Sequence, residues 1–333
     1  MTEASRLGYV IVTDYVTADG TQDLSDAIQK IIDDNPNRTI YFPDGVYLLS
    51  KPICTPAHPK KSVDLRLSNY AVLKAAETWD SDEAMVRLGA IHPANDIYTI
   101  GSNYAFTGGI VDGSGIAKGI SIDGGRETKV RDVSIKHVKI GLHIKHGANS
   151  GSSDCDIMDV NIIGNGAVDS IGVLVQGYDN TLSNMGIARV QVGVMLQSAG
   201  NSMRNLHPLY TCSYEDYENS CGFWDYAGNN WYNFCYSDHF GIGFRTSMGA
   251  RGIYDSCFTF WYAARGKQTA FKADSKFNSV MTNFNIGFHR DSKENVVLSV
   301  AEEGGHGVMD RLSVNRDLTT DDTYKTYMTG TYY

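Results

Sequence analysis

The chain has 333 residues, of which 42% are hydrophobic, enough to bury a full core, and its formal net charge at pH 7 is −9. The negative field, together with the absence of any run rich in lysine and arginine, argues against nucleic acid as a partner. No stretch of about 18 consecutive apolar residues occurs, which argues against a membrane-spanning helix. Because the net charge is negative, a neutral or cation-bridged ligand is the expected partner.

Glycine (34 residues) and tyrosine (20 residues) are frequent, a composition typical of short strands joined by tight turns. The six cysteines show no CxxC pair and no zinc-like spacing, so no metal site through sulfur is predicted. Most are expected to be buried thiols, and a bridge between Cys212 and Cys221 is left open. The N-terminal segment has no basic stretch followed by an apolar run, which leaves cytoplasm, a trimmed secreted protein and a phage particle as possible locations.

The first predicted elements lie between residues 13 and 53. Asp19-Gly20-Thr21 is typical of a turn, and Asp23 or Ser25 is a suitable cap for the helix that follows. Asp34-Asn35-Pro36 ends this helix, and residues 39–47 are predicted to form two short strands around a Pro-Asp-Gly turn. The helix carries an apolar stripe at helical spacing, made of Leu24, Ala27, Ile28, Ile31 and Ile32.

Two motifs in this region carry a family resemblance: Ala27-Ile28-Gln29, and Phe42-Pro43-Asp44-Gly45-Val46-Tyr47. At this spacing the chain resembles the pectate-lyase-like β-helix superfamily, although Gln22-Asp23-Leu24 departs from the usual acidic pair. The resemblance implies an all-β, right-handed parallel β-helix whose N-terminal helix caps the open end of the first coil. It leaves the reaction open, since polygalacturonases, polysaccharide lyases, epimerases and tailspikes share this opening.

A repeat of about 21 residues follows, in which a glycine precedes an apolar residue. The glycines are Gly119, Gly141, Gly172, Gly193, Gly222 and Gly243. The common spacing of 21 or 22 residues corresponds to one coil, and spacings of 31 and 29 to a coil with an added loop. We therefore predict one solenoid domain over residues 1–333, with a cap and first strands at about 10–60, coils at about 61–300, and a C-terminal cap or oligomerisation segment at 301–333.

The repeat also predicts which side chains share a column along the solenoid, about 4.8 Å apart. Asn180, Asn201 and Asn230 share a register typical of an asparagine ladder. Four residues before the glycine, one column holds His137, Arg189 and His239, and the column before it holds Lys136, Ala188 and Asp238. In the coil between, Leu209 and Tyr210 occupy these columns, and an insertion from Thr211 to Cys221 begins directly after Tyr210.

The insertion brings acidic side chains to the coil of Asp238. Glycoside hydrolysis uses two carboxylates about 5–5.5 or 6.5–9.5 Å apart, which neighbouring coils are able to supply. We therefore predict a glycoside hydrolase acting on a poly- or oligosaccharide, with Asp238 paired with one of Asp216, Glu218 or Asp225. The alternative for these acids is a role in solubility alone. The predicted substrate-binding residues are His239, Arg189, Tyr210, His137, Lys136 and Trp224.

Two other functions stay open at this point. A polysaccharide lyase would use Lys136 or Arg189 as base, with calcium held by Asp154, Asp156 and Asp159. For the hydrolase, no metal or other cofactor is predicted. A non-catalytic, tailspike-like glycan-binding protein is the third alternative. For it a homotrimer is predicted, in which the tyrosine-rich run from 324 to 333 pairs as a strand with another subunit.

Overall fold

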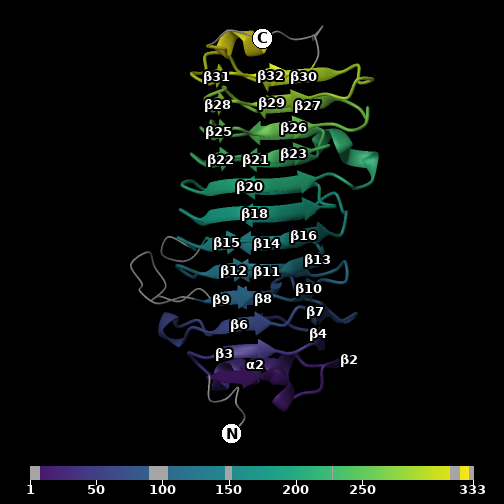
Figure 1. The fold of residues 1–333 in the computed structure, drawn as a ribbon, viewed down its shortest axis with the longest axis vertical. Helices are drawn as coiled ribbons and strands as arrows, with labels where there is room; N and C mark the ends of the chain where they lie inside the picture. Colours follow the sequence, from purple (N-terminus) through teal and green to yellow (C-terminus); the bar gives the residue numbers. More distant parts are fainter. Residues whose placement is uncertain (1–7, 90–103, 147–151, 227, 316–322, 330–333) are drawn as a thin grey trace. The chain divides into compact units, whose positions relative to one another are not determined.

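The computed structural model describes residues 8–89, 104–146, 152–226, 228–315 and 323–329 (Figure 1). These residues form two compact units. The first unit comprises the chain up to Asn165 together with Gln176–Asn180, and the second comprises Gly166–Val175 together with the chain from Thr181 onward. Both consist of stacked coils of parallel strands, which confirms the predicted right-handed parallel β-helix. The single-domain organisation stays a prediction.

The first unit contains one α-helix and a series of short parallel strands. Its helices are η1 (Val12–Asp14), α2 (Ser25–Asp34) and η2 (Pro59–Lys61). Its strands are β1 (Tyr9–Ile11), β2 (Asp19–Asp23), β3 (Thr39–Phe42), β4 (Gly45–Leu49), β5 (Ile53–Cys54), β6 (Asp64–Leu67), β7 (Ala71–Ala75), β8 (Ala84–Leu88), β9 (Ala105–Thr107), β10 (Ile110–Asp112), β11 (Lys118–Ile122), β12 (Lys129–Arg131), β13 (Ser134–Val138), β14 (Ile140–Ile144), β15 (Asp156–Met158) and β16 (Asn161–Gly164).

The second unit repeats the pattern. Its helices are the 3-10 segments η3 (Tyr214–Asn219) and η4 (Thr323–Tyr327). Its strands are β17 (Ile171–Val175), β18 (Thr181–Ala188), β19 (Val192–Leu196), β20 (Ser202–Leu209), β21 (Cys221–Asp225), β22 (Trp231–Asn233), β23 (Tyr236–Asp238), β24 (Ile242–Thr246), β25 (Ile253–Asp255), β26 (Phe258–Phe260), β27 (Gln268–Ala273), β28 (Val280–Thr282), β29 (Asn285–Gly287), β30 (Asn295–Val300), β31 (Val308–Asp310) and β32 (Ser313–Val314).

The predicted helix is α2, and it forms the N-terminal cap. The Asp23 carboxylate accepts hydrogen bonds from the Ser25 backbone N–H (3.1 Å) and hydroxyl (2.6 Å) at its start. Ile28, Ile31 and Ile32 are buried, as the apolar stripe predicted. The side chain of Gln29, from the Ala-Ile-Gln motif, exchanges two hydrogen bonds with the backbone of Cys54 in β5, which joins the helix to the first coil.

The predicted glycines line up within each unit. In the second unit Val173, Val194, Phe223 and Phe244, each directly after a repeat glycine, pair in register. In the first unit Ile120 pairs with Leu142 in the same way. Glycine is needed because neighbouring backbones approach closely, so that a Cβ added at Gly193 would lie 2.4 Å from the carbonyl oxygen of Gly222.

Inward-facing rings fill the core of the second unit. Phe223 and Phe244 stack with centroids 4.8 Å apart, and Tyr232 stacks on Tyr254 at 4.4 Å. At the coil bend, the Asn230 side-chain oxygen accepts from the backbone N–H (2.9 Å) and the side-chain amide (3.2 Å) of Asn201, which confirms this step of the asparagine ladder.

Three further predictions have outcomes in the structure. All six cysteines are free, so Cys212 and Cys221 do not form a bridge. The proposed C-terminal strand is wrong for residues 324–327, because Thr323–Tyr327 form η4 and Tyr327 packs on Phe277 at 5.0 Å between ring centroids. Met328 forms an isolated parallel bridge with Met309. Residues 330–333 of that run lie outside the described residues. No helix in the described ranges is both long and apolar enough to span a lipid bilayer.

Candidate functional site

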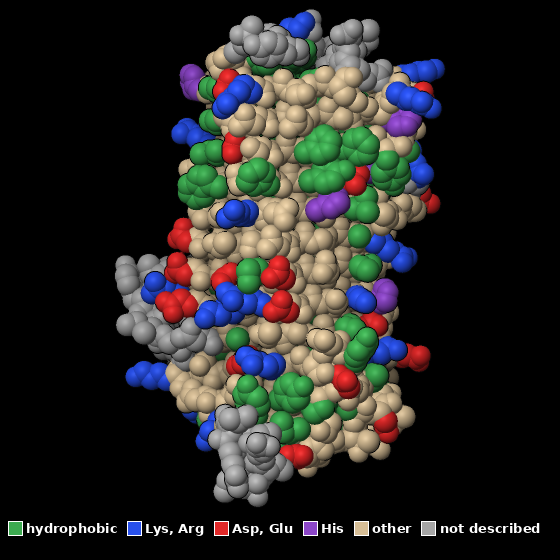
Figure 2. All heavy atoms as spheres, viewed as in Figure 1, with side chains coloured by type: hydrophobic (Ala, Val, Ile, Leu, Met, Phe, Trp, Pro, Cys, Tyr) green, Lys and Arg blue, Asp and Glu red, His purple; other side chains and the backbone are tan. Residues whose placement is uncertain are grey.

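An outward row of rings crosses three consecutive coils of the second unit. Tyr236 of β23 pairs with Phe258 of β26 in the sheet register, and their rings stack at 5.0 Å. On the other side of Tyr236, the imidazole of His207 in β20 stacks at 4.3 Å with an interplanar angle of 13°. The upper part of Figure 2 shows hydrophobic side chains gathered on this face beside a histidine and an acidic side chain.

Asp238 lies directly beside this row. It pairs in register with Leu209, and Leu209 pairs with Ala188, so the predicted column is confirmed within the second unit. His207 Nε2 lies 3.5 Å from Asp238 Oδ2, and the side chains are 45% and 14% exposed. Asp238 Oδ1 is buried and has no hydrogen-bond partner among the described residues. The Asp238 carboxylate is therefore largely buried beside the ring row, with its Oδ2 close to His207 Nε2.

The phenols next to Asp238 respond to its charge. Burial, and then the negative charge of Asp238, raise the pKa values of Tyr236 and Tyr262 above the ordinary range for tyrosine. Both therefore stay protonated at neutral pH and keep a hydroxyl hydrogen to donate. Tyr262 is 46% exposed, so its ring remains accessible to a ligand.

His239 follows Asp238 in the chain and is covered by neighbouring rings. Its backbone is left-handed (φ 63°), its side chain is fully buried, and both ring nitrogens are without hydrogen-bond partners in the described part of the chain. Tyr262 stacks over the imidazole at 3.8 Å, and Tyr217 of η3 lies 5.7 Å away. Burial lowers the pKa of His239 to about 4, so the ring is neutral at pH 7. The predicted contact with substrate would require the covering rings to move.

The insertion packs beside His239 through Tyr217. Its two predicted acids, Asp216 and Glu218, have different surroundings. The Asp216 side chain is held by amide groups of Gln191 (3.1 Å) and Asn219 (2.5 Å). Glu218 is exposed, and its Oε1 accepts from the backbone N–H of Lys267 at 3.3 Å. Its segment packs on the coil of Asp238, since a Cβ added at Gly241 would lie 2.9 Å from Glu218 Cα.

Of the remaining predicted residues of the second unit, Tyr210 adjoins Asp238, to whose carbonyl its backbone N–H donates at 2.9 Å, and the others lie elsewhere. Asp225 is fully buried at the end of β21, where it accepts from the Gly228 backbone and the Asn230 side chain, each at 3.1 Å, and burial raises its pKa to about 6. Trp224 belongs to the other sheet. Arg189 is exposed on a left-handed turn. Tyr210 is buried, and its hydroxyl donates to the Ser213 carbonyl at 2.9 Å.

His137 and Lys136 belong to the first unit, so they are not placed with Asp238. His137 is exposed on a left-handed turn (φ 52°), and its Nδ1 lies 3.0 Å from Asp112 Oδ1. Lys136 is half-buried in β13 and pairs in register with Asp112 of β10 and Ile163 of β16. The lyase base predicted at Lys136 therefore has a carboxylate, that of Asp112, at the same column position on the neighbouring coil.

Besides Phe258, the residue of this site that sequence reasoning did not select is His207. It lies two residues before Leu209, so the period of two along a strand places both side chains on one face. The register Leu209 to Asp238 then brings His207 opposite Tyr236. The signal was present in the predicted columns, but Pro208 between them obscured the strand, because proline is rare in sheet interiors.

A model for the rhamnogalacturonase A/epimerase, pectate lyase-like family matches residues 9–219. The chain belongs to this family. The match confirms the superfamily resemblance carried by the N-terminal motifs. Among curated protein sequences none matches the chain.

Solved structures show the same fold at low sequence identity. The tailspike protein of E. coli bacteriophage HK620, solved as a double mutant, matches with a TM-score of 0.68 and 13% identity over 96% of this chain and 65% of its own. ORF18 of Geobacillus virus E2 matches with 0.64 and 14% over 92% and 62%. An alginate lyase from Paenibacillus sp. str. FPU-7 matches with 0.57 and 13% over 84% and 97%. The chain thus spans less than two-thirds of either phage protein.

Metal ligation was predicted only for the lyase alternative in this family. Within the described ranges, no group of three or more His, Cys, Asp and Glu side chains is arranged to hold a metal ion. Of the three aspartates predicted to bind calcium, Asp154 pairs with Arg126 at 2.8 Å and Asp156 pairs with Arg131. These two carboxylates therefore already have cationic partners.

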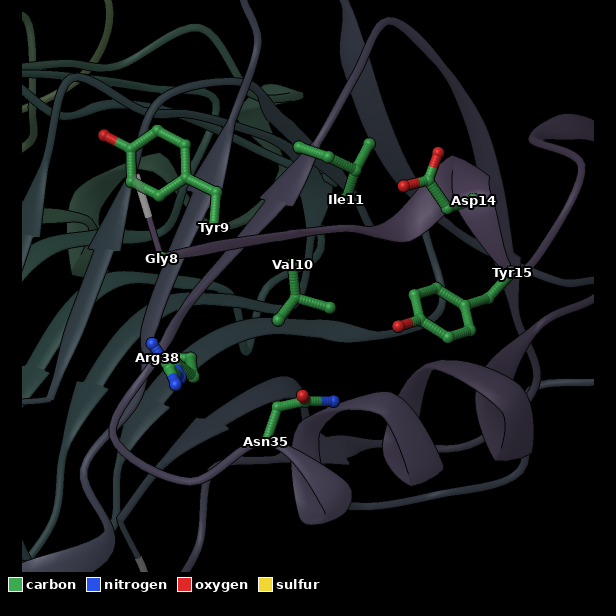
Figure 3. Close-up of a pocket in the computed structure, with 8 residues that line it drawn as sticks. All are labelled: Gly8, Tyr9, Val10, Ile11, Asp14, Tyr15, Asn35 and Arg38. Atoms are coloured by element: carbon green, nitrogen blue, oxygen red, sulfur yellow. The ribbon is translucent and has the colours of Figure 1, made fainter. Parts of the chain in front are cut away.

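A separate hollow of about 250 Å³ lies at the N-terminal cap of the first unit, between η1 and the end of α2. Figure 3 shows the Tyr15 hydroxyl pointing toward its middle, with Asp14 and Arg38 at opposite ends. The charged side chains do not converge on a common point, in contrast to His207 and Asp238. The ring row with its His207–Asp238 pair is the candidate site.

Proposed function

We propose that this protein binds a poly- or oligosaccharide across the ring row of His207, Tyr236 and Phe258 and hydrolyses it at Asp238. The observation that carries the proposal is the His207–Asp238 pair, 3.5 Å apart, at the edge of that row. Aromatic faces offer broad apolar contact to sugar rings, and a flanking carboxylate supplies the acid or base chemistry. Membership of a carbohydrate-active family supports the same substrate class.

Glu218 is the second carboxylate in this proposal. It is exposed and belongs to the segment that packs on Gly241, three residues after Asp238. Asp216 is less suitable because Gln191 and Asn219 hold it, and Asp225 because it is buried. Asp238 and Glu218 then act as the acid and base pair, while His207 and Tyr262 orient the sugar through its hydroxyls.

The test compares product release by the native protein, Asp238→Asn and Glu218→Gln on a panel of polysaccharides, with product masses recorded. We expect each variant to lose about 10²–10⁴-fold in rate, the usual contribution of a general acid or base. Glu303→Gln, an exposed acid of the same unit, is the matched control and should keep full activity. Unchanged sugar release by both site variants would refute the hydrolase site.

The His207–Asp238 pair also favours a second candidate, a polysaccharide lyase. An exposed imidazole oriented by a carboxylate is a suitable base for the proton beside a uronic carboxylate, and the hydroxyl of Tyr262 is a suitable acid for the leaving oxygen. This assignment differs from the base expected at Lys136 or Arg189. Elimination adds no water and produces an unsaturated sugar that absorbs in the near ultraviolet, whereas hydrolysis adds one water.

The masses therefore separate the candidates. Products heavier by one water support hydrolysis, and unsaturated products lost in His207→Gln support the lyase. Binding without any product supports the non-catalytic protein, for which the homotrimer stays a prediction. In that case Tyr236→Ala should weaken binding, because one stacked ring is lost.

A further inference from the structure

A second cluster of aromatic and charged side chains lies on the other sheet of the second unit. Trp224 of β21, Arg245 of β24 and Lys272 of β27 pair in register on three consecutive coils. Their side chains point outward, since their neighbours in the strands, Phe223 and Phe244, are buried in the core. An aromatic ring and two cations thus form one continuous column.

The column is held in a defined geometry by Asp274. Its carboxylate accepts from Arg245 Nε at 2.7 Å and from the Ser247 hydroxyl, and Lys272 Nζ lies 3.6 Å away. Burial opposes ionisation of Asp274, but the hydrogen bonds from Ser247 and Arg245 outweigh it and lower the pKa of this carboxyl. Ser247 in turn accepts from the indole N–H of Trp224 at 2.9 Å. The side chains are therefore ordered before any ligand arrives.

Hydrogen-bond donors of Arg245 and Lys272 are not all used by contacts within this cluster. The Cζ of Arg245 lies 3.9 Å from the centroid of the Trp224 ring, and the Nε of Arg245 donates to Asp274. The two terminal nitrogens of Arg245 have no hydrogen-bond partner among the described residues. Lys272 is 37% exposed and has one carboxylate neighbour. Arg245 and Lys272 against Asp274 leave one positive charge, on a chain whose net charge is −9.

We propose that Trp224, Arg245 and Lys272 form a second, non-catalytic carbohydrate-binding site that takes an anionic sugar of the uronic acid class. The sugar carboxylate binds to the free donors of Arg245 and Lys272, and the sugar ring lies against Trp224 and its neighbour Tyr226, which is 37% exposed. The site belongs to a different sheet from Asp238. It therefore does not depend on the reaction proposed above.

The test is calorimetric titration of the full chain carrying Asp238→Asn, so that the ligand is not consumed, with a galacturonate trisaccharide. We expect Lys272→Gln to weaken binding at least about tenfold, because a hydrogen bond to a charged group is lost. Lys276→Gln removes the same charge from a nearby exposed position and should bind as the parent does. Equal affinity of both variants would overturn the proposal.

Two further probes separate a sugar site from a simple anion site. The neutral galactose trisaccharide should bind at least about tenfold more weakly, since the carboxylate is missing. Sodium sulfate at matched ionic strength should compete poorly, because it lacks the ring contact with Trp224, and Trp224→Ala should weaken the trisaccharide but not sulfate. Full competition by sulfate, with no effect of Trp224→Ala, would show an anion site without sugar specificity and refute the assignment.

Discussion

His239 and Asp225 are buried titratable side chains of the second unit, and burial moves their pKa values in opposite directions. The pKa of His239 falls from 6.5 to about 4, and that of Asp225 rises from 3.8 to about 6. Burial disfavours the charged form in both cases, which is the cation of histidine and the anion of aspartate. Each residue is therefore close to neutral over much of the range between pH 4 and 6.

These shifts predict opposing effects on stability in acid. As pH falls from 6.5 to 4, the unfolded state takes up a proton at His239 before the folded state does, so stability falls by about 3 kcal/mol. As pH falls from 6 to 3.8, the folded state takes up a proton at Asp225 first, so stability rises by a similar amount. The two terms largely cancel in the native protein.

Single substitutions should expose each term. We expect Asp225→Asn to become more sensitive to acid than the native protein between pH 6 and 4, and His239→Asn to become less sensitive. Asparagine tolerates the left-handed backbone at residue 239, so that strain is small. Urea unfolding at half-unit pH steps measures the effect, and parallel pH profiles for all three proteins would contradict it.

At the scale of elements, α2 is expected to stabilise the first coil through its apolar face. Ile28 is fully buried, and truncation to alanine leaves a cavity, so Ile28→Ala should cost about 2–5 kcal/mol. Lys30→Ala in the same helix removes only an exposed pair with Asp34 and should leave the unfolding midpoint nearly unchanged. Equal midpoints of these two variants in urea unfolding would show that α2 does not cap the coil.

Sequence patterns predict elements of this fold well because the coil has a strict local period. The stripe on α2, the strands at 39–47 and the register of Gly172 and Gly193 all follow from spacings of three to four, two, and 21 residues. The same period indicates that Asp225 points inward, two residues after the buried Phe223. An inward carboxylate is costly without partners, and only the structure shows that Gly228 and Asn230 provide them.

The candidate site was less predictable than the columns that compose it. The register alone places Asp238 beside Leu209, but a spacing does not tell whether a side chain at a coil corner turns out or in. His239 is buried beneath Tyr262, whereas His207 stays exposed against Tyr236. Whether a tyrosine ring covers a given histidine depends on the packing of side chains between coils. The spacing of residues along the sequence does not determine this packing.

At the scale of the whole molecule, the net charge of −9 acts against the anionic sugars proposed for the Trp224 site. Charges more than a Debye length away, about 10 Å at 0.1 M salt, are largely screened, whereas direct contacts to Arg245 and Lys272 are less affected. Long-range repulsion therefore limits association at low salt more than at physiological salt. A short acidic oligosaccharide is consequently a better probe of this site than a long polyanion.

The prediction of one solenoid domain has a test at the same scale. Each coil of a solenoid gains stability from its neighbours, so a continuous stack of this length is expected to unfold cooperatively. Calorimetry should show a single transition, with equal calorimetric and van't Hoff enthalpies. At about 2.1 cal/mol/K of unfolding entropy per residue, a loss of 2–5 kcal/mol lowers Tm by about 3–7 °C for a chain of 333 residues.

Paired core variants decide whether the two units share that transition. Ile28→Ala truncates a buried side chain of the first unit, and Phe244→Ala one of the second. If the chain is one domain, both variants lower the midpoint temperature of the same unfolding transition, because each coil that unfolds removes the packing partner of the next coil. If instead each variant shifts its own transition and leaves the other in place, the units fold independently. The continuous 21-residue repeat would then describe two solenoids joined in sequence.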